Sequence, residues 1–145
     1  MKRYFLLFIP LVIIICLLFR PVSYAFLQDM SDLNQVQIEI VHIETDLGFH
    51  RGAAYADEYI SVIQIIENDE KTDFISDFNN VRSYQPNIGG RIDAISGDAI
   101  RIIYLNGEIE LITCYGTATV INGKIRVFTT TFDSDGFNAL LEKYK

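Results

Sequence analysis

Cysteine is scarce in this 145-residue sequence, which contains two. Cys16 lies inside an apolar run near the N-terminus, so Cys114 is the single cysteine of the remaining chain. A disulfide within that part is therefore excluded, and its stability must come from a hydrophobic core. Small secreted eukaryotic domains usually carry disulfides, so this composition favours a bacterial protein. Cys114 falls in a predicted strand, where a cysteine is more often a small core residue than a reactive thiol.

Basic residues are also few, twelve against nineteen acidic ones. Lys2, Arg3 and Arg20 stand near the N-terminus, whereas every acidic residue follows Leu27. Beyond Leu27, nine basic and nineteen acidic residues give a net charge of −10. Such a surface repels phosphate backbones and anionic headgroups, so no nucleic-acid partner is expected. The usual role of an acidic surface is to keep a protein soluble. A more specific role is to attract cations or a basic partner.

Catalytic signatures are missing as well, since the sequence contains no Gly-x-Ser-x-Gly, Ser-x-x-Lys or His-Glu-x-x-His. One cluster mixes imidazoles and carboxylates, which are typical zinc ligands: His42, Glu44, Asp46 and His50. Their spacing matches no helical or loop metal signature, so we interpret them as strand-end and loop residues and predict no cofactor. A small metal-dependent hydrolase that uses this region is the alternative.

Two further polar patterns have ordinary structural explanations. Asp133-Ser-Asp-Gly136 with Glu142 resembles part of an EF-type calcium loop, but Thr131 occupies the first ligand position and no helix precedes it. We therefore interpret Asp133 as a helix cap. Tyrosines distributed along the chain suggest either an aromatic face for a glycan or peptide, or core residues with hydroxyls at the rim, which is commoner. These are Tyr55, Tyr59, Tyr84, Tyr104, Tyr115 and Tyr144.

The longest hydrophobic run extends from Tyr4 to Phe19 without a charge and follows Lys2 and Arg3. This pattern predicts that residues 1–27 are a transmembrane anchor or a signal peptide, with the N-terminus in the cytoplasm and residues 28–145 outside the cell membrane. The apolar length, continued to Leu27, favours a single-pass anchor that contacts the membrane through residues 4–27. Ser23-Tyr24-Ala25 would suit a signal peptidase, and cleavage after Ala25 would give a secreted protein.

The exported part is predicted to be organised around two hairpins. Asn106-Gly107 separates strands 99–105 and 108–115, and Asn122-Gly123 separates strands 117–121 and 124–130. An Asn-Gly pair favours a type I′ turn, which needs positive φ at both central residues. The hydrophobic alternation changes register at Gly116, so we expect a bulge or a tight bend there. Ile112 and Ile121 interrupt the alternation, which predicts that the second face of the sheet is partly covered.

The remaining elements follow from periodicity. Alternation predicts a strand from Val36 to Ile43, and the nearly unbroken apolar run 59–66 predicts a strand buried on both faces. Helices are predicted over residues 70–81, capped by Asn68 or Asp69, and over residues 134–144, capped by Asp133. Phe132 and Phe137 have the spacing of a hydrophobic staple. Residues 28–34 are predicted to form a polar tether or a frayed lead-in to the first strand, and residues 45–58 and 82–93 to form connections.

Together these features predict an α+β fold. It has a mostly antiparallel sheet, built from a four-stranded C-terminal meander and two N-terminal strands, with both helices on one face. A hydrophobic helix precedes it.

Several segments resemble small exported or membrane-anchored proteins of Gram-positive, clostridia-like bacteria. They are the N-terminal apolar segment, the Phe-x-x-Asp-Phe pattern at 74–78, Gly-Asp-Ala-Ile-Arg-Ile-Ile-Tyr-Leu-Asn-Gly-Glu at 97–108, Ile-Asn-Gly-Lys at 121–124 and Phe-Asn-Ala-Leu-Leu-Glu-Lys-Tyr at 137–144. The resemblance implies the fold and the compartment and assigns no catalytic residue. The sequence therefore predicts a non-enzymatic extracytoplasmic module that binds a protein or cell-envelope partner. A secreted inhibitor would require cleavage.

Overall fold

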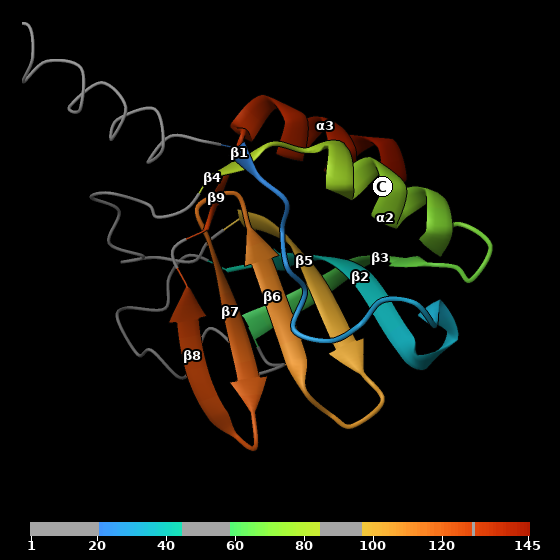
Figure 1. Cartoon of the computed structure of the whole chain (residues 1–145), viewed down its shortest axis with the longest axis vertical. Helices are drawn as coiled ribbons and strands as arrows, with labels where there is room; N and C mark the ends of the chain where they lie inside the picture. The colour runs from blue at the N-terminus through green and yellow to red at the C-terminus, as the bar shows by residue number, and fades with distance from the viewer. Residues whose placement is uncertain (1–20, 45–58, 85–96, 129) are drawn as a thin grey trace, which may run out of the picture.

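The protein is built on a six-stranded antiparallel sheet that two helices cover on one face (Figure 1). The computed structural model describes residues 21–44, 59–84, 97–128 and 130–145. The strand order is β3-β2-β5-β6-β7-β8, in which every neighbouring pair is antiparallel. The strands are β2 (Val36–Ile43), β3 (Ile60–Ile66), β5 (Gly97–Tyr104), β6 (Ile109–Thr113), β7 (Gly116–Ile121) and β8 (Lys124–Phe128). The predicted α+β class, meander and pair of N-terminal strands are confirmed.

A smaller sheet closes one end of the molecule. Its order is β1-β4-β9, with β1 (Pro21–Val22), β4 (Ser83–Tyr84) and β9 (Thr131–Phe132) all paired antiparallel. It joins the N-terminal segment to β4, which follows the helix at residues 71–80, and through β4 to β9, which precedes the helix at residues 134–144. Three segments far apart in sequence therefore meet at this point.

The two helices present aromatic side chains to the sheet. In α2 (Lys71–Asn80), Phe74 and Phe78 are 1 % exposed, and in α3 (Ser134–Tyr144), Phe137 is fully buried. Full burial of such a side chain stabilises a fold by about 1.5–3 kcal/mol. Asp133 caps α3, since its Oδ2 accepts a hydrogen bond from the Gly136 N–H at 3.0 Å. The predicted helices and this cap are confirmed.

The start of α2 differs from the prediction. Neither Asn68 nor Asp69 caps it. The N-cap residue is Glu70, and its side chain makes no capping hydrogen bond. Asn68 instead accepts a hydrogen bond from Lys71 Nζ at 2.7 Å, and the same ammonium group donates to the Leu33 and Val36 carbonyls. A buried lysine here joins α2 to the chain that leads into β2.

The two Asn-Gly turns also differ from each other. Asn122 (φ 51°) and Gly123 (φ 71°) both have positive φ, as a two-residue type I′ turn requires. In the other hairpin only Gly107 (φ 80°) does, and the Gly107 N–H donates to the Tyr104 carbonyl. Three residues therefore form this loop, with glycine in the left-handed position. The prediction of a type I′ turn was wrong for Asn106.

At the β6–β7 connection the predicted tight bend is confirmed and the predicted position of Cys114 is corrected. Thr113 pairs with Gly116, so the chain reverses over two residues, as the change of register predicts. Cys114 consequently lies in the turn rather than in a strand. Its side chain is half-buried, and burial raises the pKa of its thiol, with a smaller contribution from the Asp133 charge.

Both faces of the central strands are buried. Ile38, Ile40, Ile100 and Ile112 lie on the helical face, whereas a second cluster lies on the opposite face. That second cluster contains Val41, Ile43, Ala99 and Leu111. The predicted covering of the second face is confirmed.

Strand β3 is the clearest correction. It lies at the edge of the sheet, and Val62, Ile63 and Ile65 are 45 %, 42 % and 45 % exposed. An unbroken apolar run is typical of a strand that is buried on both faces. Whether a strand is central or at the edge depends on its pairing with strands far away in the sequence, and the run itself carries no information on that pairing. Ile66 alone of this strand belongs to the buried core.

The predicted N-terminal helix (within residues 1–20), the whole connection 45–58 and residues 85–96 lie outside the described residues. Among the residues that the structure does describe, neither helix is long and apolar enough to cross a membrane.

Candidate functional site

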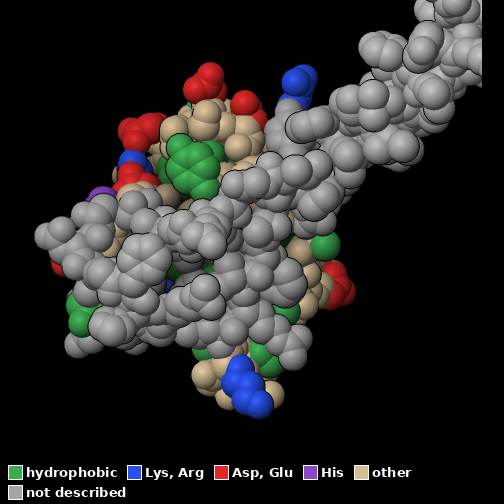
Figure 2. All heavy atoms as spheres, turned by 90° about the vertical axis from the view of Figure 1, so that its left-hand side faces the viewer, with side chains coloured by type: hydrophobic (Ala, Val, Ile, Leu, Met, Phe, Trp, Pro, Cys, Tyr) green, Lys and Arg blue, Asp and Glu red, His purple; other side chains and the backbone are tan. Residues whose placement is uncertain are grey.

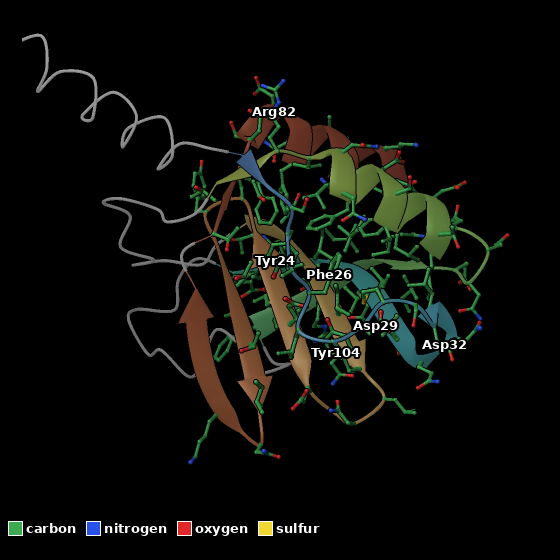
Figure 3. All side chains as sticks on the ribbon, in the orientation of Figure 1. Tyr24, Phe26, Asp29, Asp32, Arg82 and Tyr104 are labelled. Carbon is green, nitrogen blue, oxygen red and sulfur yellow. The ribbon has the colours of Figure 1, made fainter. Side chains whose placement is uncertain are left out.

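The segment that follows β1 is an integral part of the domain rather than a tether. We call residues 23–33 the N-terminal strap. Its apolar side chains, Tyr24, Phe26, Leu27, Met30 and Leu33, pack against the main core. Figure 3 shows the strap running across β5 and β6 beside the helices, and its Tyr24 and Phe26 pack against the main core. The prediction of a polar tether at residues 28–34 is therefore corrected, and the folded unit begins before residue 28.

The strap is fixed by a buried carboxylate on β6. Glu110 is 2 % exposed, and its Oε1 accepts a hydrogen bond from the Tyr24 hydroxyl at 2.5 Å. Its Oε2 accepts from the Tyr104 hydroxyl at 2.5 Å and from the Leu27 N–H at 3.1 Å. Because hydrogen bonds to an ionised group are about twice as strong as neutral ones, three donors can keep this carboxylate inside the domain. We call these four residues the Glu110 lock.

The tyrosines of the Glu110 lock are poor acids. Burial raises the pKa of Tyr24 far above its usual value, and the neighbouring Glu110 charge adds to the shift. The pKa of Tyr104 is raised by the same causes in the same order. Both hydroxyls therefore remain protonated donors at physiological pH, and the site is suited to holding the strap rather than to transferring a proton.

Aromatic rings surround this lock. Tyr24 meets Phe78 of α2 edge-on, with ring centroids 5.5 Å apart, and meets Phe132 of β9 at 5.4 Å. Phe132 and Phe137 are 5.4 Å apart, so the predicted hydrophobic staple is confirmed. Such pairs contribute about 0.5–1.5 kcal/mol beyond the area they bury. The strap is thus bound by both polar and apolar contacts.

The predicted ligand cluster is only partly within the described residues. His42 and Glu44 are described, whereas Asp46 and His50 lie outside. His42 Nδ1 lies 2.7 Å from Asp98 Oδ1, and Lys145 Nζ lies 2.7 Å from Asp98 Oδ2. Hydrogen bonding by Lys145, then by His42, lowers the pKa of Asp98. Within the described residues, no three histidine, cysteine or acidic side chains gather as a metal site would require.

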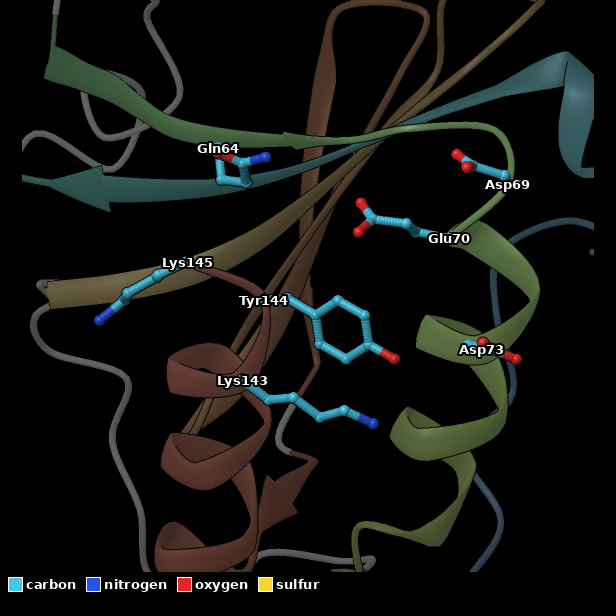
Figure 4. A pocket seen from close by; sticks show the side chains of 7 residues that line it. All are labelled: Gln64, Asp69, Glu70, Asp73, Lys143, Tyr144 and Lys145. Carbon is cyan, nitrogen blue, oxygen red and sulfur yellow. The ribbon is translucent and has the colours of Figure 1, made fainter.

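A shallow groove lies between β3 and the facing ends of the two helices (Figure 4). Acidic residues of the α2 end form one wall, and residues of the α3 C-terminus form the other. The lining residues are Gln64, Asp69, Glu70, Asp73, Lys143, Tyr144 and Lys145. Lys143 and Tyr144 both donate to Asp77 Oδ2, at 2.5 and 2.6 Å. The two lysines are thus bound to carboxylates, while the carboxylates of the opposite wall are exposed.

A further ion pair lies on the face of the sheet opposite to the helices. Arg101 Nε is 2.6 Å from Glu39 Oε2, and the two side chains are 10 % and 4 % exposed. The two residues face each other on β5 and β2. Gln37 donates to the remaining oxygen of Glu39. This pairing compensates the burial of two charges and aligns the two strands.

The tyrosines separate into buried and exposed groups. Tyr104 is buried in the Glu110 lock, and the Tyr144 hydroxyl reaches Asp77 at the rim, so the prediction of core positions is confirmed for these two. It is wrong for Tyr115, which is 70 % exposed in the β6–β7 turn. Tyr55 and the side chain of Tyr84 lie outside the described residues. Tyr24 was missed as a fold residue, because the sequence around it also suits a signal peptidase.

No family model, curated protein or solved structure matches this chain. The resemblance to small exported proteins therefore remains a prediction.

Proposed function

We propose that this protein is a membrane-anchored extracytoplasmic module that binds a protein or cell-envelope partner and performs no catalysis. The observation that carries the anchoring is the Glu110 lock. It holds the chain directly after the apolar N-terminal run, through Tyr24 and Leu27. A domain held in this way would lie close to the outer face of the cell membrane, since few residues separate the strap from the apolar run.

The lock favours retention of residues 1–27 over their removal. Tyr24 and Leu27 stand on either side of the bond that follows Ala25, and both donate to the same carboxylate. A chain cut after Ala25 would lose β1 and the Tyr24 hydroxyl. Glu110 would keep two of its three donors, and loss of a hydrogen bond to a buried charge is costly. The anchored form is therefore the one in which the domain is fully stabilised.

The edge strand favours a binding role. Val62, Ile63 and Ile65 expose large apolar side chains side by side on β3. Neighbouring apolar residues on an exposed sheet edge are typical of surfaces that bind another chain. The ion pair of His42 with Asp98, which lies beside β3 because His42 pairs with Ser61, has a structural purpose instead, since it joins β2 to β5.

Subcellular fractionation of a Gram-positive host that expresses the full chain tests the anchoring. We expect the protein in the membrane fraction, an intact N-terminal segment by mass spectrometry, and digestion of the domain by protease added to intact protoplasts. A cytoplasmic protein with the same tag controls for lysis. A mature N-terminus at Phe26 together with protein in the medium would overturn the anchor and favour the secreted inhibitor.

A further inference from the structure

Among the described residues, strand β3 is an edge strand of the large sheet. Its inner neighbour is β2, with Ile66 opposite Ile38, and no strand of the described residues pairs with its other side. Edge strands in soluble proteins are usually shielded by charged residues or by a covering segment. The exposed side chains on β3 are instead uncharged, Ser61 together with the large apolar Val62, Ile63 and Ile65. The strand therefore presents both backbone hydrogen-bonding groups and apolar side chains to an approaching chain.

The charges around β3 identify the kind of chain that fits. Residues 59–66 carry no charge, whereas Asp57 and Glu58 precede them, and Glu67, Asp69 and Glu70 follow them in the sequence. The last three are exposed, and Asp69 and Glu70 line the groove next to Gln64 of β3 (Figure 4). Pairing of two copies through β3 would bring together two domains that each carry a net charge of −10 beyond Leu27. Such like charges oppose self-association and favour a basic partner.

Acidic side chains also gather elsewhere on the helical layer. In Figure 2 they lie at the top of the visible face, over the helices, while lysine or arginine side chains stand mainly at its periphery. With a net charge of −10 beyond Leu27, the domain attracts cationic segments over distances of about 8–10 Å at physiological salt. The field would therefore bring a basic segment toward the domain before short-range contacts form.

We propose that β3 binds an extended segment of a partner protein by strand addition, and that this segment is apolar in its centre with lysine or arginine at its ends. Backbone hydrogen bonds to the β3 edge provide the affinity, and the apolar side chains provide the fit. The acidic residues that flank the strand select the basic ends. This inference rests on the proposed function, since the partner must reach the exported domain.

Fluorescence anisotropy of a labelled synthetic peptide tests the proposal on the full chain in phosphatidylcholine nanodiscs. The probe is Lys-Lys-Val-Thr-Val-Thr-Val-Lys-Lys, and empty nanodiscs report any binding to lipid. Two matched peptides carry glutamate in place of lysine, or proline in place of the central valine. We expect the first probe to bind and both matched peptides to bind about tenfold more weakly, because one has the wrong charge and the other lacks a backbone donor.

Aspartate substitutions separate strand addition from simple charge attraction. Val62→Asp and Ile65→Asp add negative charge, so attraction alone would strengthen binding of the lysine probe. Strand addition predicts about tenfold weaker binding, because a carboxylate must lose water against an apolar strand. Leu105→Asp is the matched control, since Leu105 is 78 % exposed in the β5–β6 turn, and its binding should be unchanged. Circular dichroism confirms that each variant is folded.

Four results would overturn the proposal. The first three are that the lysine probe binds none of the proteins, that the proline peptide binds as well as the probe, and that the Val62→Asp variant binds more tightly. The fourth is that sedimentation velocity shows a dimer that Val62→Asp dissociates, which would make β3 an interface between copies. None of these results depends on whether residues 1–27 are retained in the cell. The proposal of a membrane anchor and the proposal of strand addition at β3 can therefore be refuted independently of each other.

Discussion

Single hydrogen bonds decide how the strap is held. Glu110 lies inside the domain because Tyr24, Tyr104 and the Leu27 N–H surround its two oxygens. Tyr24 and Glu110 are 86 positions apart in sequence, so neither predicts the other. The arrangement has a direct consequence for stability.

Tyr24→Phe removes one donor from the Glu110 carboxylate and keeps the aromatic ring. The expected loss in the free energy of unfolding is about 1.5–3 kcal/mol, the contribution of a hydrogen bond to a charged group. Urea denaturation of residues 21–145, followed by circular dichroism, measures it. Tyr115→Phe is the control and should change stability by less than about 0.5 kcal/mol, because Tyr115 is exposed. Equal effects of the two substitutions would contradict the role of the lock.

Asp98 makes part of the stability depend on pH. Its hydrogen bonds with Lys145 and His42 lower its pKa below the usual 3.8. At a pH between the folded and the unfolded pKa of Asp98, the unfolded chain binds more protons than the folded one. The contribution of Asp98 to the free energy of unfolding is therefore complete above about pH 4 and decreases as the pH falls toward the folded pKa. Asp98→Asn should therefore flatten the acid limb of a plot of urea midpoint against pH. Asp73→Asn, on the exposed face of α2, should leave that limb in place.

Secondary-structure elements begin and end where short-range chemistry dictates. Asp133 precedes α3, and its side chain satisfies the Gly136 N–H in the first turn. Asn122-Gly123 makes the two-residue turn that its composition favours. Both features involve residues within three positions of each other, so local sequence is sufficient to predict them.

Asp133→Ala should lower the free energy of unfolding by about 0.5–2 kcal/mol, since alanine cannot accept the hydrogen bond at the cap. Thermal unfolding of residues 21–145 measures the change. Ser134→Ala is the neighbouring control, because Ser134 is exposed and lies just inside the helix. If both substitutions cost the same, the cap is not the source of the effect.

At the scale of the whole molecule, the N-terminal strap completes the core. It brings Tyr24, Phe26 and Leu27 onto the two helices and the sheet, and it supplies two of the donors to Glu110. The small sheet then ties β1 to β4 and β9. A truncation therefore tests the architecture as a unit.

Residues 28–145 should be less stable than residues 21–145 by at least about 3 kcal/mol, because the truncation removes two hydrogen bonds to Glu110 and three apolar contacts. Denaturant titration of both fragments at equal concentration measures the difference. Residues 23–145, which lack only β1, should lose much less. Similar stability of all three fragments would show that the strap contributes little to the folded state.

The α+β class, six sheet strands, both helices and the α3 cap could be predicted from sequence, since each depends on periodicity or on neighbouring residues. Part of the candidate site could not be predicted. The apolar run 59–66 reads the same whether the strand is central or at an edge, and Tyr24 reads as part of a signal peptide. His42 was recognised as a polar strand-end residue, but its partner Asp98 is 56 positions away.

By itself, the sequence determined the local features: where chains reverse, where helices begin, and how charge is divided along the chain. Tertiary structure alone decided that the strap is folded into the core, that Glu110 is its acceptor, and that β3 lies at the edge. The physical reason is the sequence separation between the residues that make each contact. Turns and caps depend on contacts between residues a few positions apart, whereas strand order and the lock depend on contacts that form only when the whole domain is packed.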